Sequence, residues 1–331
     1  MKARQYFTHG LADSTQRTYS APQRQYLAFC SRLDLSPFPA SEQTLMLFVT
    51  ELASRIQPQS IPVYHSAIRA LHIAHGYPNP LDDTLQLRQT VRGINRLHGI
   101  TAKQKLAITI ELLGDLKQFI SLSSHDDYVK WSAVVTTHFF LLRCGEFIVL
   151  HPKDFRPDRH LTLADVQFRT SPDGTEFIAL RLKTSKTDQF RRSHTLFSGH
   201  SKSDICPVCC LQTLIRHYNP SSHDYNTTPL FALQDSSPLT RPCLLSFSSS
   251  RLRMLGIDPT LFGGHSFRIG GATSAANAGI PEYLIKTIGR WSSDCYQRYI
   301  RTPLNSVISV SETLAKPPPV PYVYASPTYL P

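Results

Sequence analysis

The side chains best suited to chemistry lie near the C-terminus, in GGHSFRIGGATSAANAGIPEYLIKTIGRWSSDCYQRYIR, residues 263–301. His265 and Arg268 are three residues apart, so they share one face at the start of a predicted helix. Free amides and the helix dipole favour an anion there. Trp291 and two tyrosines follow. Arginine can bind phosphate oxygens and histidine can move a proton, so the stretch indicates phosphate chemistry.

A further arginine stands far upstream, where it is costly to bury. Arg143 lies in LLRCGEF, near the end of an almost uniformly hydrophobic helix that we predict over 128–147. A buried guanidinium needs an anionic partner. Glu146 can supply it three residues on, and so can a bound phosphate. Both partners stay open at this point.

Alternating apolar and polar residues follow this helix. They predict three strands over 160–169, 176–189 and 191–199, with SPDG as a turn, and hence a small antiparallel sheet. The second connection carries Lys183 at the end of a strand and Lys186 at or near the tip. Such lysines are usually solvated, yet a hairpin tip can also bring an ammonium group to a groove.

Two cysteines invite a metal interpretation. Cys206 and Cys209 form a C-x-x-C pair in CPVCC, but no second pair follows, and His200 and His217 lack zinc-finger spacing. We therefore predict that CPVCC begins a helix, and we expect no metal. The cysteines number seven and show no repeated spacing, which favours a reducing compartment over a disulfide framework.

The first hundred residues predict a helical domain. Apolar residues recur at helical spacing over 14–33, 41–55, 60–76 and 84–99, with Ser or Thr at several starts. On the fourth helix, one face carries Arg88, Arg92 and Arg96. This stripe is either a solvated face or a phosphate contact. The polar stretch after it, with Lys103 and Lys105, is interpreted as a linker.

Composition supports a nucleic-acid partner. The chain has 331 residues, a hydrophobic fraction of 41% and a formal net charge of +11. Its length allows two domains with sizeable cores. We find no apolar run long enough to span a bilayer, no export signal and no basic amphipathic helix. The basic excess therefore favours DNA or RNA over a membrane.

The order of these elements resembles the tyrosine recombinase (phage integrase) family. Arg143 stands in L-L-R-x-G-E, Lys186 on a hairpin, His265-x-x-Arg268 at the start of a small-residue helix, and Trp291 before a tyrosine. The resemblance covers most of the chain. STQRTY, SKTDQ, GGHSFRIGGAT and GRWSSDCYQRYIR are most similar to recombinases of eukaryotic mobile elements, such as cryptons and tyrosine-recombinase retroelements.

The resemblance implies a mostly α fold with a small antiparallel β-sheet. Residues 1–100 would form a helical core-binding (SAM-like) domain and 101–108 a linker. Residues 109–314 would form an α+β tyrosine recombinase catalytic domain. The proline-rich tail, 315–331, would be extended rather than helical.

It also implies metal-independent cleavage and rejoining of double-stranded DNA through a 3′-phosphotyrosyl intermediate, with no cofactor. Tyr299 would be the nucleophile. Arg143 and Arg268 would bind the non-bridging oxygens, giving charge stabilisation that magnesium supplies elsewhere. His265 would assist proton transfer from the tyrosine, and Lys186 would protonate the leaving 5′-oxygen.

The residues assigned as the nucleophile and as the catalytic lysine each have an alternative nearby, and Trp291 departs from the usual family pattern. Trp291 occupies the place of a second histidine in many relatives, and its indole can donate a hydrogen bond but cannot relay a proton. Tyr299 lies one residue closer to Trp291 than is usual in relatives, so Tyr296 stays possible as the nucleophile. Lys183 is likewise an alternative to Lys186.

Glu146 and Asp165 match acidic positions that in the family support the arginine and the fold. The DNA contacts that we predict are Arg88, Arg92, Arg96, Lys103, Lys105 and Arg290. The family implies a homotetramer on two DNA duplexes, and the substrate implies the nucleus. Two other functions stay open: a recombinase-derived DNA-binding protein without cleavage activity, and DNA relaxation of the type IB topoisomerase kind.

Overall fold

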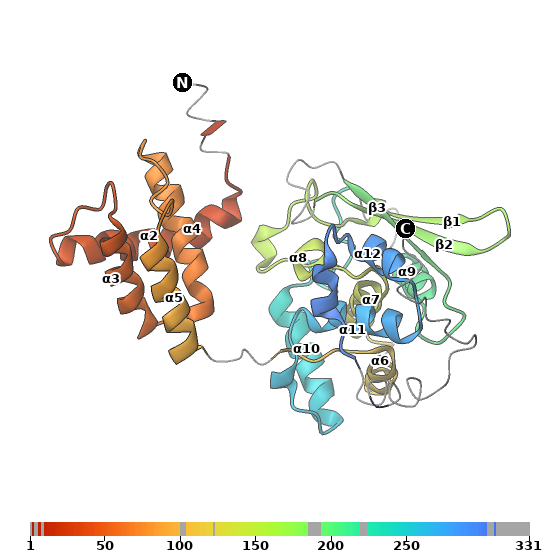
Figure 1. Cartoon of the computed structure of the whole chain (residues 1–331). Coiled ribbons are helices and arrows are strands. Elements are labelled where there is room, and N and C mark those ends of the chain that lie inside the picture. The colour runs from red at the N-terminus through yellow and green to blue at the C-terminus, as the bar shows by residue number, and fades with distance from the viewer. Residues whose placement is uncertain are drawn as a thin grey trace, which may run out of the picture. The chain divides into compact units, whose positions relative to one another are not determined.

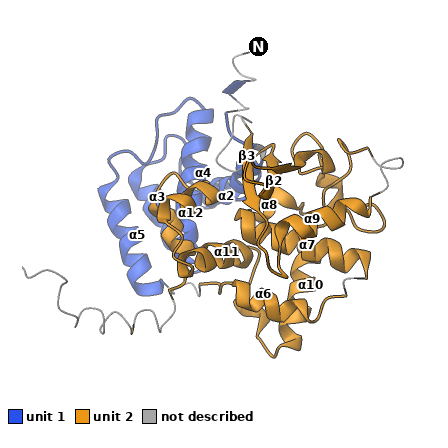
Figure 2. Ribbon diagram, turned by 90° about the vertical axis from the view of Figure 1, so that its right-hand side faces the viewer, with its two compact units in different colours: residues 1–103 blue, residues 104–331 orange. Residues whose placement is uncertain are grey.

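The protein was analysed as a computed structural model. It describes residues 10–99, 104–121, 123–184, 193–218 and 224–302, with single positions beyond these ranges. The chain divides into two compact units, residues 1–103 and 104–331 (Figure 2). None of the described helices combines the length and the apolar character that crossing a bilayer demands.

The first unit is a group of helices around one core (Figure 1). They are α2 (Asp13–Arg32), α3 (Glu42–Ala53), α4 (Ile61–Ala74) and α5 (Leu85–His98), with the 3₁₀ turn η1 (Pro58–Ser60) before α4. Helix α2 packs on α4 and α3 on α5, which buries Tyr26, Phe48 and Ile68. Ser41 caps α3 by accepting a hydrogen bond from the Thr44 amide. The predicted helices of this region are confirmed.

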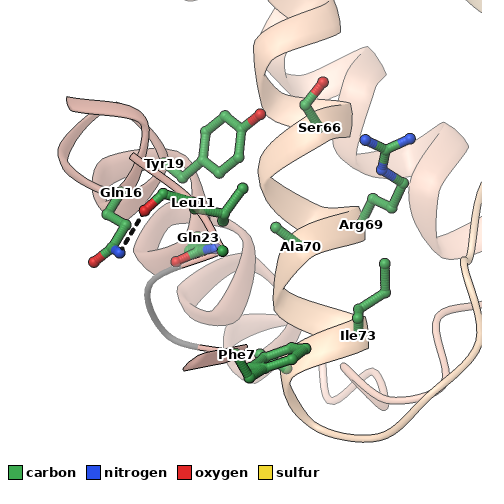
Figure 3. A pocket seen from close by; sticks show the side chains of 11 residues that line it. Phe7, Leu11, Gln16, Tyr19, Gln23, Ser66, Arg69, Ala70 and Ile73 are labelled. Atoms are coloured by element: carbon green, nitrogen blue, oxygen red, sulfur yellow. Dashed lines mark hydrogen bonds between the residues drawn. The ribbon is translucent and has the colours of Figure 1, made fainter. Parts of the chain in front are cut away.

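A hollow of about 460 Å³ lies on this unit, between α2 and α4 (Figure 3). Phe7, Leu11, Tyr19 and Ile73 line it, together with Arg69. The lining is mainly apolar, whereas the side chains predicted to be catalytic belong to the second unit.

The second unit is mostly helical, with one small sheet (Figure 1). Its main elements are α6 (Ile110–Lys117), α7 (His125–Phe140), α8 (Cys144–Phe147), β1 (Val166–Thr170), β2 (Glu176–Leu182), β3 (His194–Gly199), α9 (Pro207–Arg216), α10 (Arg241–Met254), α11 (Ser266–Asn277), α12 (Glu282–Gly289) and the 3₁₀ helix η5 (Asp294–Tyr299). Short 3₁₀ turns are η2 (Pro152–Asp154), η3 (Leu163–Asp165) and η4 (Pro259–Leu261). Helix α7 is buried along most of its length, and α9 and α11 pack against it. The predicted fold class is confirmed.

The sheet is antiparallel, as predicted, and its strand order is β1-β2-β3. Phe168 pairs with Ile178, and Leu180 with Leu196. The strands are shorter than the alternation suggested, since β2 ends at Leu182 and β3 begins at His194. Lys186 lies outside the described residues.

The linker prediction over 101–108 extends too far. Residues 104–108 belong to the second unit, where the Leu106 and Ile108 amides donate to the carbonyls of Leu261 and Ser266 at 2.9 and 3.0 Å. A Cβ on Gly270 would lie 1.7 Å from the Ile108 carbonyl oxygen, so glycine is what lets this segment lie against α11.

The long helix predicted over 128–147 is also wrong, because it is interrupted. Helix α7 ends at Phe140, and Leu141 is left-handed, with φ 47° and ψ 47°. Arg143 is therefore the N-cap of α8 rather than part of a long helix. The interruption frees the Leu141 carbonyl, which accepts hydrogen bonds from two arginines of the site described next.

Candidate active site

Arg143 and Glu146 bind each other at the start of α8. Arg143 Nη1 donates to Glu146 Oε1 at 2.9 Å, and the Arg143 backbone amide donates to Oε2 at 2.8 Å. The Arg143 side chain is 16% exposed and that of Glu146 only 3%. Glu146 is thus the anionic partner of Arg143, and part of the Arg143 side chain stays accessible to solvent.

Arg290, predicted from the sequence as a DNA contact, is part of the same cluster. Its Nη2 lies 2.7 Å from Glu146 Oε2, and its side chain is 7% exposed. It also donates to the carbonyls of Phe140, Leu141 and Ile288. Arg290 adopts φ 57° and ends α12, and this turn directs its side chain inward.

Arg268 is fully buried at the start of α11. Its guanidinium donates to the Leu141 carbonyl and, at 2.7 Å, to that of Gly289. The guanidinium carbon lies 4.2 Å from the ring centroid of Trp291 and 5.2 Å from that of Tyr299, within cation–π range. Burial, followed by repulsion from Arg143 and Arg290, lowers the pKa of Arg268 to about 9. The group therefore stays charged at neutral pH.

The cluster carries more positive than negative charge. In the described part of the chain, Glu146 is the carboxylate that pairs with its arginines. Arg268 and Arg290 each keep a buried Nε with no hydrogen-bond partner there. Burial lowers the pKa of Arg290 too, although Glu146 opposes the shift. Three guanidinium groups against one carboxylate favour a bound anion.

Tyr299 lies beside this cluster. Its ring centroid is 5.1 Å from that of Trp291 and 6.4 Å from that of His265, which is exposed. Tyr299 is half-buried, whereas Tyr296 is completely buried against Trp291. The structure therefore leaves only one of these two tyrosines with access to solvent.

The backbone around Tyr299 is held by short contacts. The Thr273 hydroxyl on α11 donates to the Tyr299 carbonyl at 3.2 Å and accepts from the Arg301 amide at 3.0 Å. Ser293 caps η5, because its side chain accepts a hydrogen bond from the Cys295 amide. A Cβ on Gly289 would lie 1.8 Å from the Trp291 ring, so the ring packs directly on the backbone.

Lys183 and Asp165 form a separate group at the end of β2 and the start of β1. Lys183 Nζ lies 2.6 Å from Asp165 Oδ2 and donates to the Thr162 hydroxyl and to the carbonyls of Pro157 and His160. Its ammonium is fully occupied, which fits a structural role. Asp165 also pairs with Arg181 at 3.0 Å. It supports the sheet, and the structure shows no contact between it and the arginine cluster.

Comparisons with known proteins agree with this architecture. No protein-family model matches the chain. It is 26% identical over 315 residues to an integrase/recombinase XerD homolog of Selenomonas ruminantium, covering 91% of this chain and 85% of that protein. The XerH site-specific recombinase, in a post-cleavage complex with a palindromic difH substrate, superposes with a TM-score of 0.62 at 16% identity. That match covers 89% of this chain and 79% of XerH.

Two other solved structures match nearly as well. Tn1549 transposon integrase, in complex with circular intermediate DNA, gives a TM-score of 0.58 at 17% identity, over 95% of this chain and 98% of that one. A λ integrase dimer bound to a core site gives a TM-score of 0.55 at 13% identity, and the match covers 91% of this chain and 93% of that one. The fold is that of the tyrosine recombinases.

Within this recombinase fold, the predicted DNA contacts of the first unit lie at the surface. Arg88, Arg92 and Arg96 are all exposed on α5. In the second unit, Lys105 is exposed and its ammonium donates to the Thr260 carbonyl at 2.6 Å. Lys103, like Lys186, lies outside the described residues.

One member of the arginine cluster was missed from the sequence. Arg290 belongs to the buried cluster, but its partner Glu146 is 144 residues away. The available signal was its position: Arg290 directly follows Gly289, at the end of a helix, and directly precedes Trp291. A left-handed residue there turns the side chain back toward the helix end.

Proposed function

We propose that this chain is a tyrosine recombinase that cleaves and rejoins double-stranded DNA, for site-specific recombination or integration of a mobile element. The observation that carries the proposal is the position of Tyr299, whose ring lies 5.2 Å from the guanidinium carbon of Arg268. It thus stands next to a cluster with excess positive charge. The XerD homolog and the DNA complexes of the XerH, Tn1549 and λ enzymes give further support.

In the proposed reaction, the Tyr299 hydroxyl oxygen attacks the scissile phosphorus. A phosphorus–tyrosine oxygen bond forms and the bond to the 5′-oxygen breaks. His265 takes the tyrosine proton, and Lys186 gives a proton to the departing 5′-oxygen. The 3′-phosphotyrosyl bond keeps the energy of the broken bond, so a 5′-hydroxyl of another strand can reverse the step without ATP.

The arginines supply electrostatic stabilisation in this proposal. Arg143 and Arg268 bind the non-bridging oxygens as charge develops on them. The contacts that orient Arg268 are the carbonyls of Leu141 and Gly289 and the ring of Trp291. Because these partners are already in place, the guanidinium need not reorganise when charge develops on the phosphate.

A nicked "suicide" DNA duplex tests the proposal. The DNA is taken from the ends of the element that encodes the protein, and covalent adducts are separated on a denaturing gel. We expect an adduct with the wild type and with Tyr296→Phe, and none with Tyr299→Phe. An adduct that forms with Tyr299→Phe but not with Tyr296→Phe would identify Tyr296 as the nucleophile instead.

The same experiment separates the competing functions. Gel retardation of these DNA ends without any adduct would favour a DNA-binding protein that no longer cleaves. Relaxation of supercoiled plasmids that lack the element ends would favour topoisomerase-like activity. The proposed DNA substrate further leads us to propose a nuclear enzyme, and the family resemblance leads us to propose a homotetramer on two duplexes.

A further inference from the structure

We propose that His200, Cys206 and Cys209 form a zinc site where β3 meets α9. The potential ligand atoms of these three residues lie within 4.8 Å of one another. His200 Nε2 is 3.1 Å from Cys209 Sγ. From the sequence we expected no metal, because His200 lacks finger spacing. The fold brings His200 to the cysteines because β3 ends at Gly199, just before it, and α9 begins at Pro207.

The position of Cys206 is suited to a thiolate. Cys206 is the N-cap of α9, and its sulfur accepts from the backbone amides of Cys209 and Ser201 at 3.5 and 3.4 Å. Two backbone amides directed at one sulfur, at the N-terminus of a helix, suit a thiolate. A buried thiolate needs a further positive partner, which a divalent cation would provide.

The spacing is close to that of a tetrahedral metal centre. Zinc binds sulfur at about 2.3 Å and imidazole nitrogen at about 2.0–2.1 Å, which places neighbouring ligand atoms about 3.6–3.8 Å apart. The present atoms therefore need to move by about 1 Å or less to reach this arrangement. Two thiolates and one imidazole suit zinc better than magnesium or calcium. The fourth position would take water or an oxygen ligand.

The histidine must change its hydrogen bonding for this to occur. His200 Nδ1 accepts from the Lys202 amide at 2.9 Å, so the neutral ring carries its proton on Nε2, facing Cys209. Zinc would replace that proton, and the ring proton would move to Nδ1. The Lys202 hydrogen bond then breaks. Because Lys202 lies in an exposed turn at φ 53°, its peptide group has room to rotate.

A metal there would fasten the edge of the sheet to the core. Cys206 belongs to the hydrophobic core of the second unit, whereas His200 follows the edge strand β3 and donates its amide to the Glu176 carbonyl at 3.0 Å. The site shares no residue with the arginine cluster. Its existence is therefore independent of the proposed DNA cleavage.

Metal content of the full-length chain tests the proposal. The protein is purified with a non-thiol reductant, stripped with a chelator, given equimolar Zn²⁺ and desalted. We expect about one zinc per chain in the wild type, and a tenfold or greater loss in Cys209→Ser and in His200→Asn. Cys243→Ser is the matched control, because Cys243 lies on α10 outside the cluster, and it should retain zinc as the wild type does.

Cobalt(II) provides a second readout on the wild type alone. Binding at this site should produce a sulfur-to-cobalt charge-transfer band and the intense visible bands of a tetrahedral ion. Zinc retention that is unchanged in both variants would overturn the proposal, as would a wild type that takes up neither metal. A Cys206–Cys209 disulfide in air, combined with no metal uptake after reduction, would identify a redox pair instead.

Discussion

Glu146 and Arg290 form a buried ion pair of 2.7 Å although 144 residues separate them. The second oxygen of the same carboxylate binds Arg143 at 2.9 Å. Glu146 therefore joins the start of α8 to the end of α12. Trp291 directly follows Arg290, so this one carboxylate helps to position both the arginines and the indole ring of the site.

Replacing this carboxylate should be costly. Glu146→Gln leaves the buried guanidinium groups without their negative partner, and we expect the free energy of unfolding to fall by about 3–5 kcal/mol in urea titrations. Added sulfate should restore more stability to this variant than to the wild type, since it can occupy the anion site. Asp158→Asn, at a carboxylate that is 63% exposed, should cost under about 1 kcal/mol. A similarly small loss in Glu146→Gln would contradict the clustered charge.

The two cations on Asp165 should differ in their effects. Lys183 is 15% exposed and Arg181 is 55% exposed. Lys183→Gln leaves the buried carboxylate short of a charge, so we expect a loss of about 2–4 kcal/mol, against under about 1 kcal/mol for Arg181→Gln. Lys186→Gln should instead abolish DNA cleavage. Full stability in Lys183→Gln, together with lost cleavage, would make Lys183 the general acid.

Close packing on α11 gives a third prediction. Gly270→Ala forces a Cβ against the Ile108 carbonyl, so we expect a loss of about 1–3 kcal/mol or more in the free energy of unfolding. Gly114→Ala on α6 is the matched control. Nothing lies within 4 Å of its added Cβ, so the better helix propensity should add about 0.5–1 kcal/mol. Equal stabilities of the two variants would mean that residues 104–108 do not pack as described.

The sequence predicted what depends on local pattern. The helices of the first unit follow from apolar spacing and caps such as Ser41, and the strand order follows from alternation around SPDG. What it could not predict depends on contacts between distant residues. Leu141 takes a left-handed conformation inside an apolar run, and its carbonyl accepts hydrogen bonds from arginines more than 120 residues away. The approach of His200 to Cys209 likewise needs the end of β3 to lie beside α9.

His138 predicts a loss of stability in acid. It is buried on α7, and burial lowers its pKa to about 4, despite the opposing effects of the Ile108 carbonyl and of Glu111. The unfolded chain takes up this proton near pH 6.5, but the folded chain only near pH 4. The contribution of neutral His138 to the free energy of unfolding is therefore complete above about pH 6.5. It falls by about 3 kcal/mol between pH 7 and pH 4. Denaturant titrations should show a shallower fall in His138→Gln, whereas His151→Gln, at an exposed histidine, should follow the wild type.

The arginine stripe on α5 should control the salt dependence of DNA binding. Arg88, Arg92 and Arg96 are exposed, so replacing all three by glutamine should leave the unfolding transition unchanged. The logarithm of the binding constant falls with the logarithm of the salt concentration, and each phosphate contact contributes about −0.9 to that slope. The slope of the triple variant should therefore be less negative than that of the wild type, by up to about 3. Fluorescence anisotropy with a labelled duplex, over a series of salt concentrations, measures it. Arg55→Gln is the control, because Arg55 is exposed but pairs with Glu51 at 3.0 Å, and its slope should match the wild type. An unaltered slope in the triple variant would mean that this face of α5 is only solvated, and DNA contacts of the first unit would then have to be sought on another of its helices.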